Sequence, residues 1–271
     1  MSDGVDSGTV ELVRMGRIHA VSCLTAPRRW PMAAQRLREL PSEVSIGLHL
    51  TLTAIPEAGP TAPGAAEPGD PGPAGLILRG LLGRLDRDAI AHRLRCQLDL
   101  FEDGLGRPPD HLDGHQHAQA VFGIPDLLHE VLAERYGAAL PWVRVTAPCL
   151  PAAPGAALNR WVIERLGRHQ RRVLAATPLR ANRSFGGIRR FNEPQPYADL
   201  LEVQLRAATA TGTLIMCHPA ADPSSPGDPI AGARRTEFAF LAGSDLPAVL
   251  DRSGCRLGPL AATALSELPG G

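Results

Sequence analysis

The stretch His111-Leu112-Asp113-Gly114-His115-Gln116-His117 determines how the rest of the chain is interpreted. Its ionisable residues occupy alternate positions, and side chains at alternate positions of a β-strand point to the same face of the sheet. The pattern therefore predicts three imidazoles and one carboxylate on one face, an arrangement that is costly to bury unpaired. A divalent metal ion would make it favourable, because neutral imidazole is a common metal ligand. The alternative is a solvent-exposed, histidine-rich strand end.

On both sides of this stretch, segments with strand and helix patterns alternate along the chain. This alternation predicts an α/β fold in which βα units form a parallel sheet or a barrel. The apolar, β-prone segments are 18–25, 44–53, 142–145, 213–217 and 255–257. The segments with helical patterns are 10–17, 30–40, 87–105, 125–137, 156–167, 197–210 and 246–252.

A segment rich in proline and glycine, at about 54–76, interrupts the alternation. Neither a helix nor a strand tolerates prolines at this density, so the segment is predicted to be a long loop. Such loops serve as lids or substrate-binding segments, and a disordered insertion is the other interpretation. A second proline-rich loop is predicted at 222–229. Since strand and helix patterns resume after the first loop, residues 1–271 are expected to form a single domain.

The composition excludes several classes of function. Acidic and basic residues number 28 each, which argues against a protein that binds nucleic acid through bulk electrostatics. The basic residues are all arginine, so lysine-dependent Schiff-base chemistry and Walker-type phosphate loops are excluded. The five cysteines form no CxxC pair and are typical of a reducing compartment. Neither a signal peptide nor an apolar run of membrane-spanning length is recognisable, so a cytoplasmic location is expected.

Two further predicted strands carry histidines. Within 44–53 leucines alternate with His49, so we expect the leucines to pack on helices and His49 to face the other side. A lone histidine there is more often a core residue than a ligand. His218 follows the apolar run 213–217, at a strand end where α/β folds place their sites, although a capping role fits equally well. Together with His115, these residues predict a catalytic metal site with two histidines, an oxygen ligand and open positions for water.

Three short strings resemble motifs of the YdjC-like carbohydrate deacetylases, a family that includes chitooligosaccharide deacetylases and a hopanoid-biosynthesis branch. The strings lie at 47–52 (GLHLTL), 109–117 (PDHLDGHQH) and 217–220 (CHPA), and the similarity extends to 254–258. The histidine-rich string is the most specific of the three. The resemblance implies an irregular, TIM-like (β/α) barrel. It also implies metal-dependent hydrolysis of an N-acetyl group, a linear amide, on an acetylated sugar or oligosaccharide.

The resemblance further implies a role for each site residue. His49 and His115 would be the histidine ligands of a divalent ion, Mg²⁺ in the first place and Zn²⁺ as the alternative. His218 would protonate the departing amine. Asp113, on the same predicted face as His115, would orient a ligand imidazole.

Two other residues are candidates for substrate binding. His117 would bind substrate or act as an alternate metal ligand. Arg144, at the end of the predicted strand 142–145, would contact the sugar, although an ordinary surface or salt-bridged arginine fits the sequence equally well. A homodimer is also expected from the resemblance.

The resemblance has one gap. Family members open with a strand ending in Ala-Asp-Asp-Phe-Gly, whose aspartates supply a metal ligand and the base. This chain opens at Met1-Ser2-Asp3-Gly4-Val5, which is similar to the part just after that motif. We therefore expect the first strand to be missing, either because the start codon is assigned too far downstream or because the chain is truncated and inactive. A reading frame that continues upstream to Asp-Asp-Phe-Gly would support the first explanation, and a stop codon immediately before Met1 would exclude it.

Two rival functions fit the same features. A metal-dependent phosphoesterase also uses histidine clusters on a barrel, but it needs more carboxylate ligands than this sequence offers. A non-catalytic sugar-binding protein could use the same pocket without hydrolysis. Activity on a generic phosphate ester identifies the first, and ligand binding without acetate release in the presence of divalent metal identifies the second.

Overall fold

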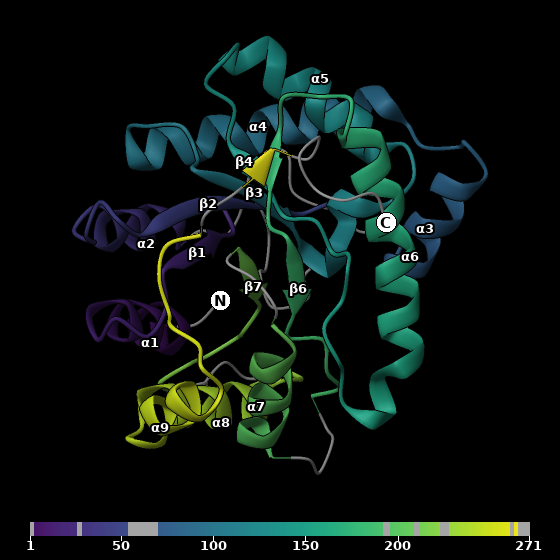
Figure 1. The fold of residues 1–271 in the computed structure, drawn as a ribbon. Helices are drawn as coiled ribbons and strands as arrows, with labels where there is room; N and C mark the ends of the chain where they lie inside the picture. Colours follow the sequence, from purple (N-terminus) through teal and green to yellow (C-terminus); the bar gives the residue numbers. More distant parts are fainter. Residues whose placement is uncertain are drawn as a thin grey trace.

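Strands and helices alternate along most of the chain in a computed structural model of the protein (Figure 1). The structure describes residues 3–25, 29–53, 70–191, 196–208, 212–222, 228–260 and 263–264. The strands are β1 (Ala20–Cys23), β2 (Ser45–Leu50), β3 (His111–Gly114), β4 (Trp142–Val143), β5 (Arg180–Ala181), β6 (Ser184–Gly186), β7 (Thr213–Ile215) and β8 (Thr263–Ala264). The helices are α1 (Asp3–Arg14), α2 (Trp30–Leu37), α3 (Pro73–Leu81), α4 (Arg87–Leu105), α5 (Ile124–Tyr136), α6 (Ala157–Leu174), α7 (Tyr197–Ala207), α8 (Ala231–Ala242) and α9 (Asp245–Arg252), with 3₁₀ segments η2 (His115–Ala120) and η3 (Pro154–Ala156).

Hydrogen bonding arranges the described strands in two sheets. Six strands form one sheet in the order β1-β2-β3-β4-β5-β8, in which β1 to β5 are parallel and β8 runs antiparallel to β5. The strands β6 and β7 form a separate parallel pair. The predicted α/β fold with a parallel sheet is therefore confirmed. The predicted barrel is not confirmed over the described residues, because β5 and β6 follow each other in the chain but pair in different sheets.

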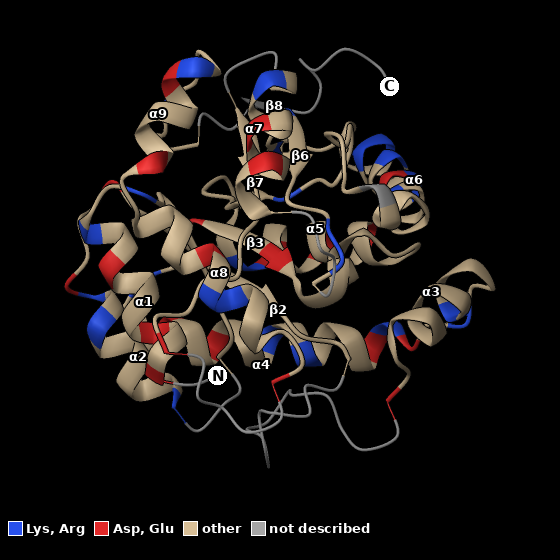
Figure 2. Ribbon diagram, turned by 90° about the horizontal axis from the view of Figure 1, so that it is seen from below, with Lys and Arg blue, Asp and Glu red and all other residues tan. Residues whose placement is uncertain are grey.

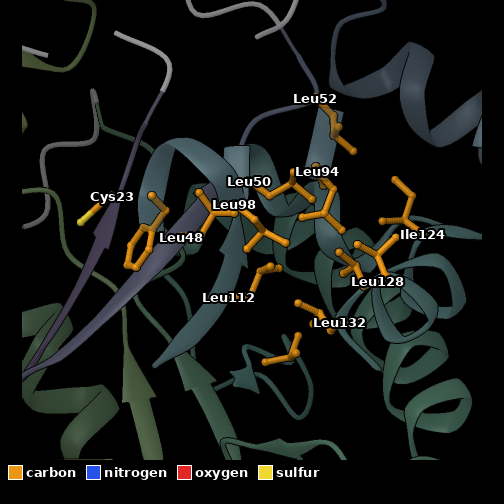
Figure 3. Close-up of a cluster of buried hydrophobic side chains, with 14 of the residues drawn as sticks. Cys23, Leu48, Leu50, Leu52, Leu94, Leu98, Leu112, Ile124, Leu128 and Leu132 are labelled. Carbon is orange, nitrogen blue, oxygen red and sulfur yellow. The ribbon is translucent and has the colours of Figure 1, made fainter. Parts of the chain in front are cut away.

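The leucine face of the main sheet carries the largest core. Leu48 and Leu50 of β2 and Leu112 of β3 are fully buried, as are Leu94 and Leu98 of α4. Figure 3 shows these side chains together, beside leucine and isoleucine side chains of α5. Each fully buried leucine contributes about 1.5–3 kcal/mol to folding. The prediction that the leucines of 44–53 pack on helices is thus confirmed, and the opposite face of these strands is left for polar side chains.

Helix α4 matches the predicted range because both of its ends are encoded locally. The Asp86 carboxylate accepts a hydrogen bond of 3.0 Å from the Ala89 N–H, which satisfies one of the free donors at the helix start. Gly106 ends the helix with φ 71°, a left-handed conformation that glycine adopts without a steric penalty. The bounds Arg87–Leu105 agree with the predicted range of 87–105.

Helix α1 differs from the prediction of a helix at 10–17, because it spans Asp3–Arg14. Glycines weaken an isolated helix, so Gly4 and Gly8 conceal its start in the sequence. Both glycines pack against the segment that follows β7. A Cβ at Gly4 would lie 1.7 Å from the Asp222 carbonyl oxygen, and a Cβ at Gly8 would lie 2.5 Å from the Ala221 nitrogen. These two positions therefore permit a close helix contact that a larger residue would prevent.

Two helices are missed by the sequence patterns. Helix α3 begins at Pro73, inside the loop predicted at about 54–76, and a proline in the first turn is compatible with a helix. Helix α8 lies where no element is predicted. The rest of the first predicted loop, 54–69, and residues 223–227 of the second lie outside the described residues.

Two predicted boundaries are also wrong. The helix predicted at 156–167 continues to Leu174, because Gly167 does not end it but lets it approach Thr146; a Cβ there would lie 2.5 Å from Thr146 Oγ1. The strand predicted at 255–257 is not formed: these residues have no regular secondary structure, and the Cys255 N–H donates to the Leu250 carbonyl of α9 just past the helix end.

A second core packs α1 against the helices α7, α8 and α9. Leu12 of α1 packs with Leu201 of α7, Leu241 of α8 and Leu246 and Val249 of α9. In Figure 1 α7, α8 and α9 lie below β6 and β7, and α1 lies to their left. The segment that follows β7 therefore lies between α1 and α8, both of which hydrogen bond to it.

Basic and acidic residues are interleaved over the helices in the view of Figure 2, in keeping with the balanced composition. Among the described residues, no helix combines the length and the apolar character that crossing a membrane requires.

Candidate active site

The strand β3 ends earlier than the alternating pattern predicts. Its last hydrogen-bonded pair joins Gly114 to Leu50 of β2, and the next residues form the 3₁₀ segment η2. Gln116 and His117 have positive φ angles of 53° and 60°, which non-glycine residues rarely adopt. The prediction that four ionisable side chains share one strand face is therefore wrong for His115 and His117. They are placed by a turn at the end of the strand.

His111 is a core residue. Its ring nitrogens lie 3.0 Å from Ser22 Oγ and 2.8 Å from Ser45 Oγ, and the ring stacks on Trp142 with centroids 4.4 Å apart. The ring also covers Gly47, where a Cβ would lie 2.3 Å from it. Burial lowers the pKa of His111 to about 4, so the ring is neutral at pH 7. Its hydrogen bonds hold β1, β2 and β3 together.

Asp113 is the centre of a buried charge network. The parallel register places Asp113 beside His49, and the Asp113 Oδ1 lies 2.6 Å from His49 Nδ1. Its Oδ2 accepts a hydrogen bond of 2.5 Å from Nη1 of Arg144, which is 2% exposed. Burial alone would raise the pKa of Asp113, but the charges of Arg144 and His49 outweigh burial and hold that pKa well below its usual range. The carboxylate is therefore ionised and fixes the His49 ring.

Arg144 also supports the end of β3. Its Nη2 donates to the Gly114 carbonyl at 2.7 Å and lies 3.4 Å from His117 Nδ1. The guanidinium lies over the Phe185 ring, 5.5 Å from its centroid. The structure therefore shows the salt-bridged arginine that the sequence allowed, whereas the predicted contact with a sugar stays a prediction.

His117 lies next to this network, since its Nδ1 is the atom 3.4 Å from Arg144 Nη2. Its ring meets Phe185 edge to face, with centroids 5.5 Å apart. Burial, together with the charge of Arg144, places the pKa of His117 well below its ordinary value. The ring is consequently neutral at pH 7 and remains partly exposed.

His218 enters the same region from β7. Its ring contacts Phe191 edge to face, with centroids 5.1 Å apart. Burial, together with the nearby charges of Arg234, His49 and Arg144, lowers the pKa of His218 to about 3. The charges of His49 and Arg144 both act on the His218 ring, so His218 lies within electrostatic range of the Asp113 network.

The His49 and His115 rings form the pair that could share a metal ion. They meet edge to face with centroids 5.7 Å apart. Burial, followed by the charge of His49, lowers the pKa of His115 to about 4, so its ring is neutral and able to bind metal. Asp113 hydrogen bonds to Nδ1 of His49, so Nε2 of the same ring is the nitrogen available to a metal ion, as in carboxylate–histidine–metal sites. Within the described part of the chain, no three His, Cys, Asp or Glu side chains form a group that could hold a metal ion. His49 and His115 therefore supply only part of the ligands that a metal ion needs.

Sequence reasoning missed the residues that surround His218. Glu237 and Arg234 of α8 both contact the His218 main chain, and Arg189 lies beside Glu237. A charged residue in a helix is ordinarily solvent-exposed, so neither the composition nor the spacing marks Glu237 as buried.

The family follows from a comparison with known proteins. A model of the YdjC-like protein family matches residues 1–252. The chain belongs to this family. A chitooligosaccharide deacetylase from Klebsiella pneumoniae (strain 342) is 28% identical over 262 residues, which cover 95% of this chain and 93% of the relative. A protein of the same name from Salmonella paratyphi B is 33% identical over 145 residues, covering 50% of this chain and 52% of the relative.

A solved structure supports the fold of this YdjC-like chain. The crystal structure of a candidate cellobiose-phosphate cleavage protein from Enterococcus faecalis V583 aligns with a TM-score of 0.64 at 19% identity. The alignment covers 95% of this chain and 92% of that chain. The two proteins share a fold over nearly their whole length, and the resemblance seen in the three short strings is confirmed at the level of the family.

Proposed function

We propose that the protein hydrolyses the N-acetyl group of an acetylated carbohydrate. The observation that carries this proposal is the meeting of His49 and His115, from two different strand ends, beside the ionised Asp113, with His218 in electrostatic range of them. Such a set offers metal ligands, a proton carrier and an orienting carboxylate, which suit metal-assisted amide hydrolysis at neutral pH. Membership of the YdjC-like family and the names of its relatives support the same class of substrate.

A divalent ion, Mg²⁺ or alternatively Zn²⁺, is proposed to be held by His49 and His115. When bound, such an ion would supply a Lewis acid for the acetyl carbonyl and lower the pKa of water. Asp113 keeps His49 in the tautomer with the proton on Nδ1, which leaves Nε2 to face the ion. The very low pKa of Asp113 makes it a poor proton donor, so orientation of His49 is the role proposed for it.

His218 is proposed to move the proton. Burial keeps the His218 ring neutral in the free protein and makes it a weaker base than free imidazole; in this neutral state one ring nitrogen is unprotonated and available for the proton that the attacking water loses. The same residue can then deliver that proton to the nitrogen of the departing amine. His117 is proposed to contact the sugar, because its partly exposed ring lies on the same side as the Asp113 network. Arg144, being almost fully buried, would act mainly through Asp113.

Acetate release from N,N′-diacetylchitobiose, measured with and without Mg²⁺ or Zn²⁺, tests the proposed function. We expect His218→Ala to lower kcat by about 10²–10⁴-fold, the range for loss of a general acid–base group. His49→Ala and His115→Ala should abolish the metal-dependent rise in Tm as well as activity. The matched control is His92→Ala, which removes an exposed histidine from α4 and should change neither property.

The rival functions give different results in the same assay. A phosphoesterase would hydrolyse p-nitrophenyl phosphate and release no acetate from diacetylchitobiose. A non-catalytic sugar-binding protein would give a calorimetric binding signal with diacetylchitobiose and no acetate in either metal. Either result would refute the proposed function.

A further inference from the structure

The segment that carries His218 depends on its neighbours for hydrogen bonding. Residues 216–220 follow β7 without regular secondary structure, and buried main-chain groups outside helices and sheets need other partners. The Glu237 carboxylate of α8 accepts a hydrogen bond from the His218 N–H. The Arg234 guanidinium, one helical turn earlier, donates to the His218 carbonyl at 3.3 Å. Two charged side chains of α8 therefore hold the His218 peptide from both of its polar ends.

The main chain after His218 is held in the same way. The Ala220 N–H donates to the Arg234 carbonyl at 3.2 Å. On the opposite side, the Ala221 N–H donates to the Gly4 carbonyl of α1 at 3.0 Å. These bonds fix the segment between α1 and α8, while the side chains of Glu237 and Arg234 act on His218 itself.

Glu237 is buried at a cost that packing does not explain. It is 1% exposed, and burial raises its pKa. Its second oxygen lies 3.4 Å from Nε of Arg189, whose guanidinium lies over the rings of Phe191 and Tyr197 at 5.5 and 5.3 Å. A buried ion pair is often no more stabilising than apolar residues of similar size. A carboxylate at this position is therefore better explained by what it binds, the His218 N–H, than by the stability it adds.

We propose that Glu237 is a positioning residue for His218: its carboxylate fixes the His218 peptide and thereby sets where the imidazole, which packs against Phe191, stands relative to the candidate site. Arg189 and Arg234 complete the arrangement by holding the carboxylate and the His218 carbonyl. The expected effect on kcat rests on the proposed function. The expected effect on how firmly the His218 ring is held does not. Helix α8 supplies none of the candidate catalytic residues. The proposal nevertheless gives α8 control over the residue that carries the proton.

Three variants separate positioning from simple packing. Glu237→Ala removes the acceptor of the His218 N–H, and Glu237→Gln keeps an amide oxygen in its place. Leu241→Ala is the matched control, because Leu241 is a buried residue of the same helix that contacts the second core. All three are compared at a temperature at which circular dichroism shows them folded.

We expect Glu237→Ala to lower kcat for acetate release by about 10–100-fold, as for loss of other groups that orient a catalytic side chain, with KM within about threefold. Glu237→Gln should keep kcat within about threefold of the unmodified protein. Leu241→Ala should lower Tm but keep kcat within about threefold. The inference is overturned if Leu241→Ala loses as much kcat as Glu237→Ala, or if Glu237→Gln is as impaired as Glu237→Ala.

A second measurement is independent of activity. Diethyl pyrocarbonate labelling of His218, followed by peptide mass spectrometry, reports how firmly the ring is held. We expect labelling of His218 to rise at least threefold in Glu237→Ala and to stay unchanged in Leu241→Ala. If the unmodified protein releases no acetate, this pattern still supports the positioning role while the proposed function fails. Equal labelling in all variants overturns the positioning role, whether or not acetate is released.

Discussion

Replacing Arg144 by methionine is predicted to leave the Asp113 carboxylate buried without its main counter-charge. The variant loses the 2.5 Å hydrogen bond to Asp113 and the 2.7 Å bond to the Gly114 carbonyl. Both side chains of the pair are almost fully buried, at 3% and 7% exposure, so solvent screens their interaction little. Removing one partner of a buried ion pair costs about 3–5 kcal/mol, because the other charge is left uncompensated. Arg144→Met should therefore be destabilised by about that amount.

Urea unfolding at pH 7.5, followed by circular dichroism, measures this loss. The matched control is Arg135→Met, because Arg135 pairs with Asp99 and Glu102 at 25% exposure. Partly exposed pairs contribute about 0–1 kcal/mol, so the control should change the free energy of unfolding little. Asp113→Asn combined with Arg144→Met removes both charges and should be less destabilised than the sum of the single variants.

Two results would refute the reasoning about Arg144. One is a loss of less than about 1 kcal/mol in Arg144→Met, which would show that Asp113 is compensated by other groups. The other is an equal loss in the Asp113→Asn background, which would show that Arg144 acts through its bond to the Gly114 carbonyl or through packing. In either case Arg144 would not be the counter-charge on which the buried Asp113 carboxylate depends.

Three further predictions concern the strands around the site. The pKa of His111 in the folded protein, about 4, lies below that of an unfolded histidine, so its stabilising contribution is complete above pH 6.5 and is lost as the pH falls toward 4. Between pH 7 and pH 5 the protein should therefore lose about 2 kcal/mol more than His111→Gln in urea unfolding, and parallel pH curves would contradict this. Gly47→Ala should cost about 1–3 kcal/mol in the same assay, because the new Cβ would overlap the His111 ring; an unchanged stability would show that the ring can move. Gln116→Val should be about 1–2 kcal/mol less stable than Gln116→Gly, because a β-branched residue tolerates a φ of 53° poorly; equal stabilities would mean that the turn can rearrange.

The parts of the fold that the sequence predicts well are those encoded by nearby residues. Helix α4 has an apolar stripe, an Asp86 cap and a Gly106 stop, all within one segment. The alternation around His49 predicts correctly which face of β2 packs on helices. The pairing of His49 with Asp113 depends on the register of two strands 64 residues apart, and no local pattern encodes that register. The same limit applies to Glu237, whose burial depends on where β7 delivers His218.

The alternating pattern at 111–117 correctly marks the candidate site, but the strand geometry from which it was interpreted ends at Gly114. In a continued strand, His115 and His117 would lie about 6–7 Å apart along one face and extend away from β2. The chain instead leaves the sheet after Gly114, and the turn at Gln116 brings the His115 ring against His49 of the neighbouring strand. Residues beyond the last hydrogen-bonded pair are free to turn in this way, which is one reason why parallel sheets place their sites at the carboxyl ends of strands. His111, still inside the ladder, cannot turn and becomes part of the core, so the end of β3 separates a structural histidine from the candidate catalytic ones.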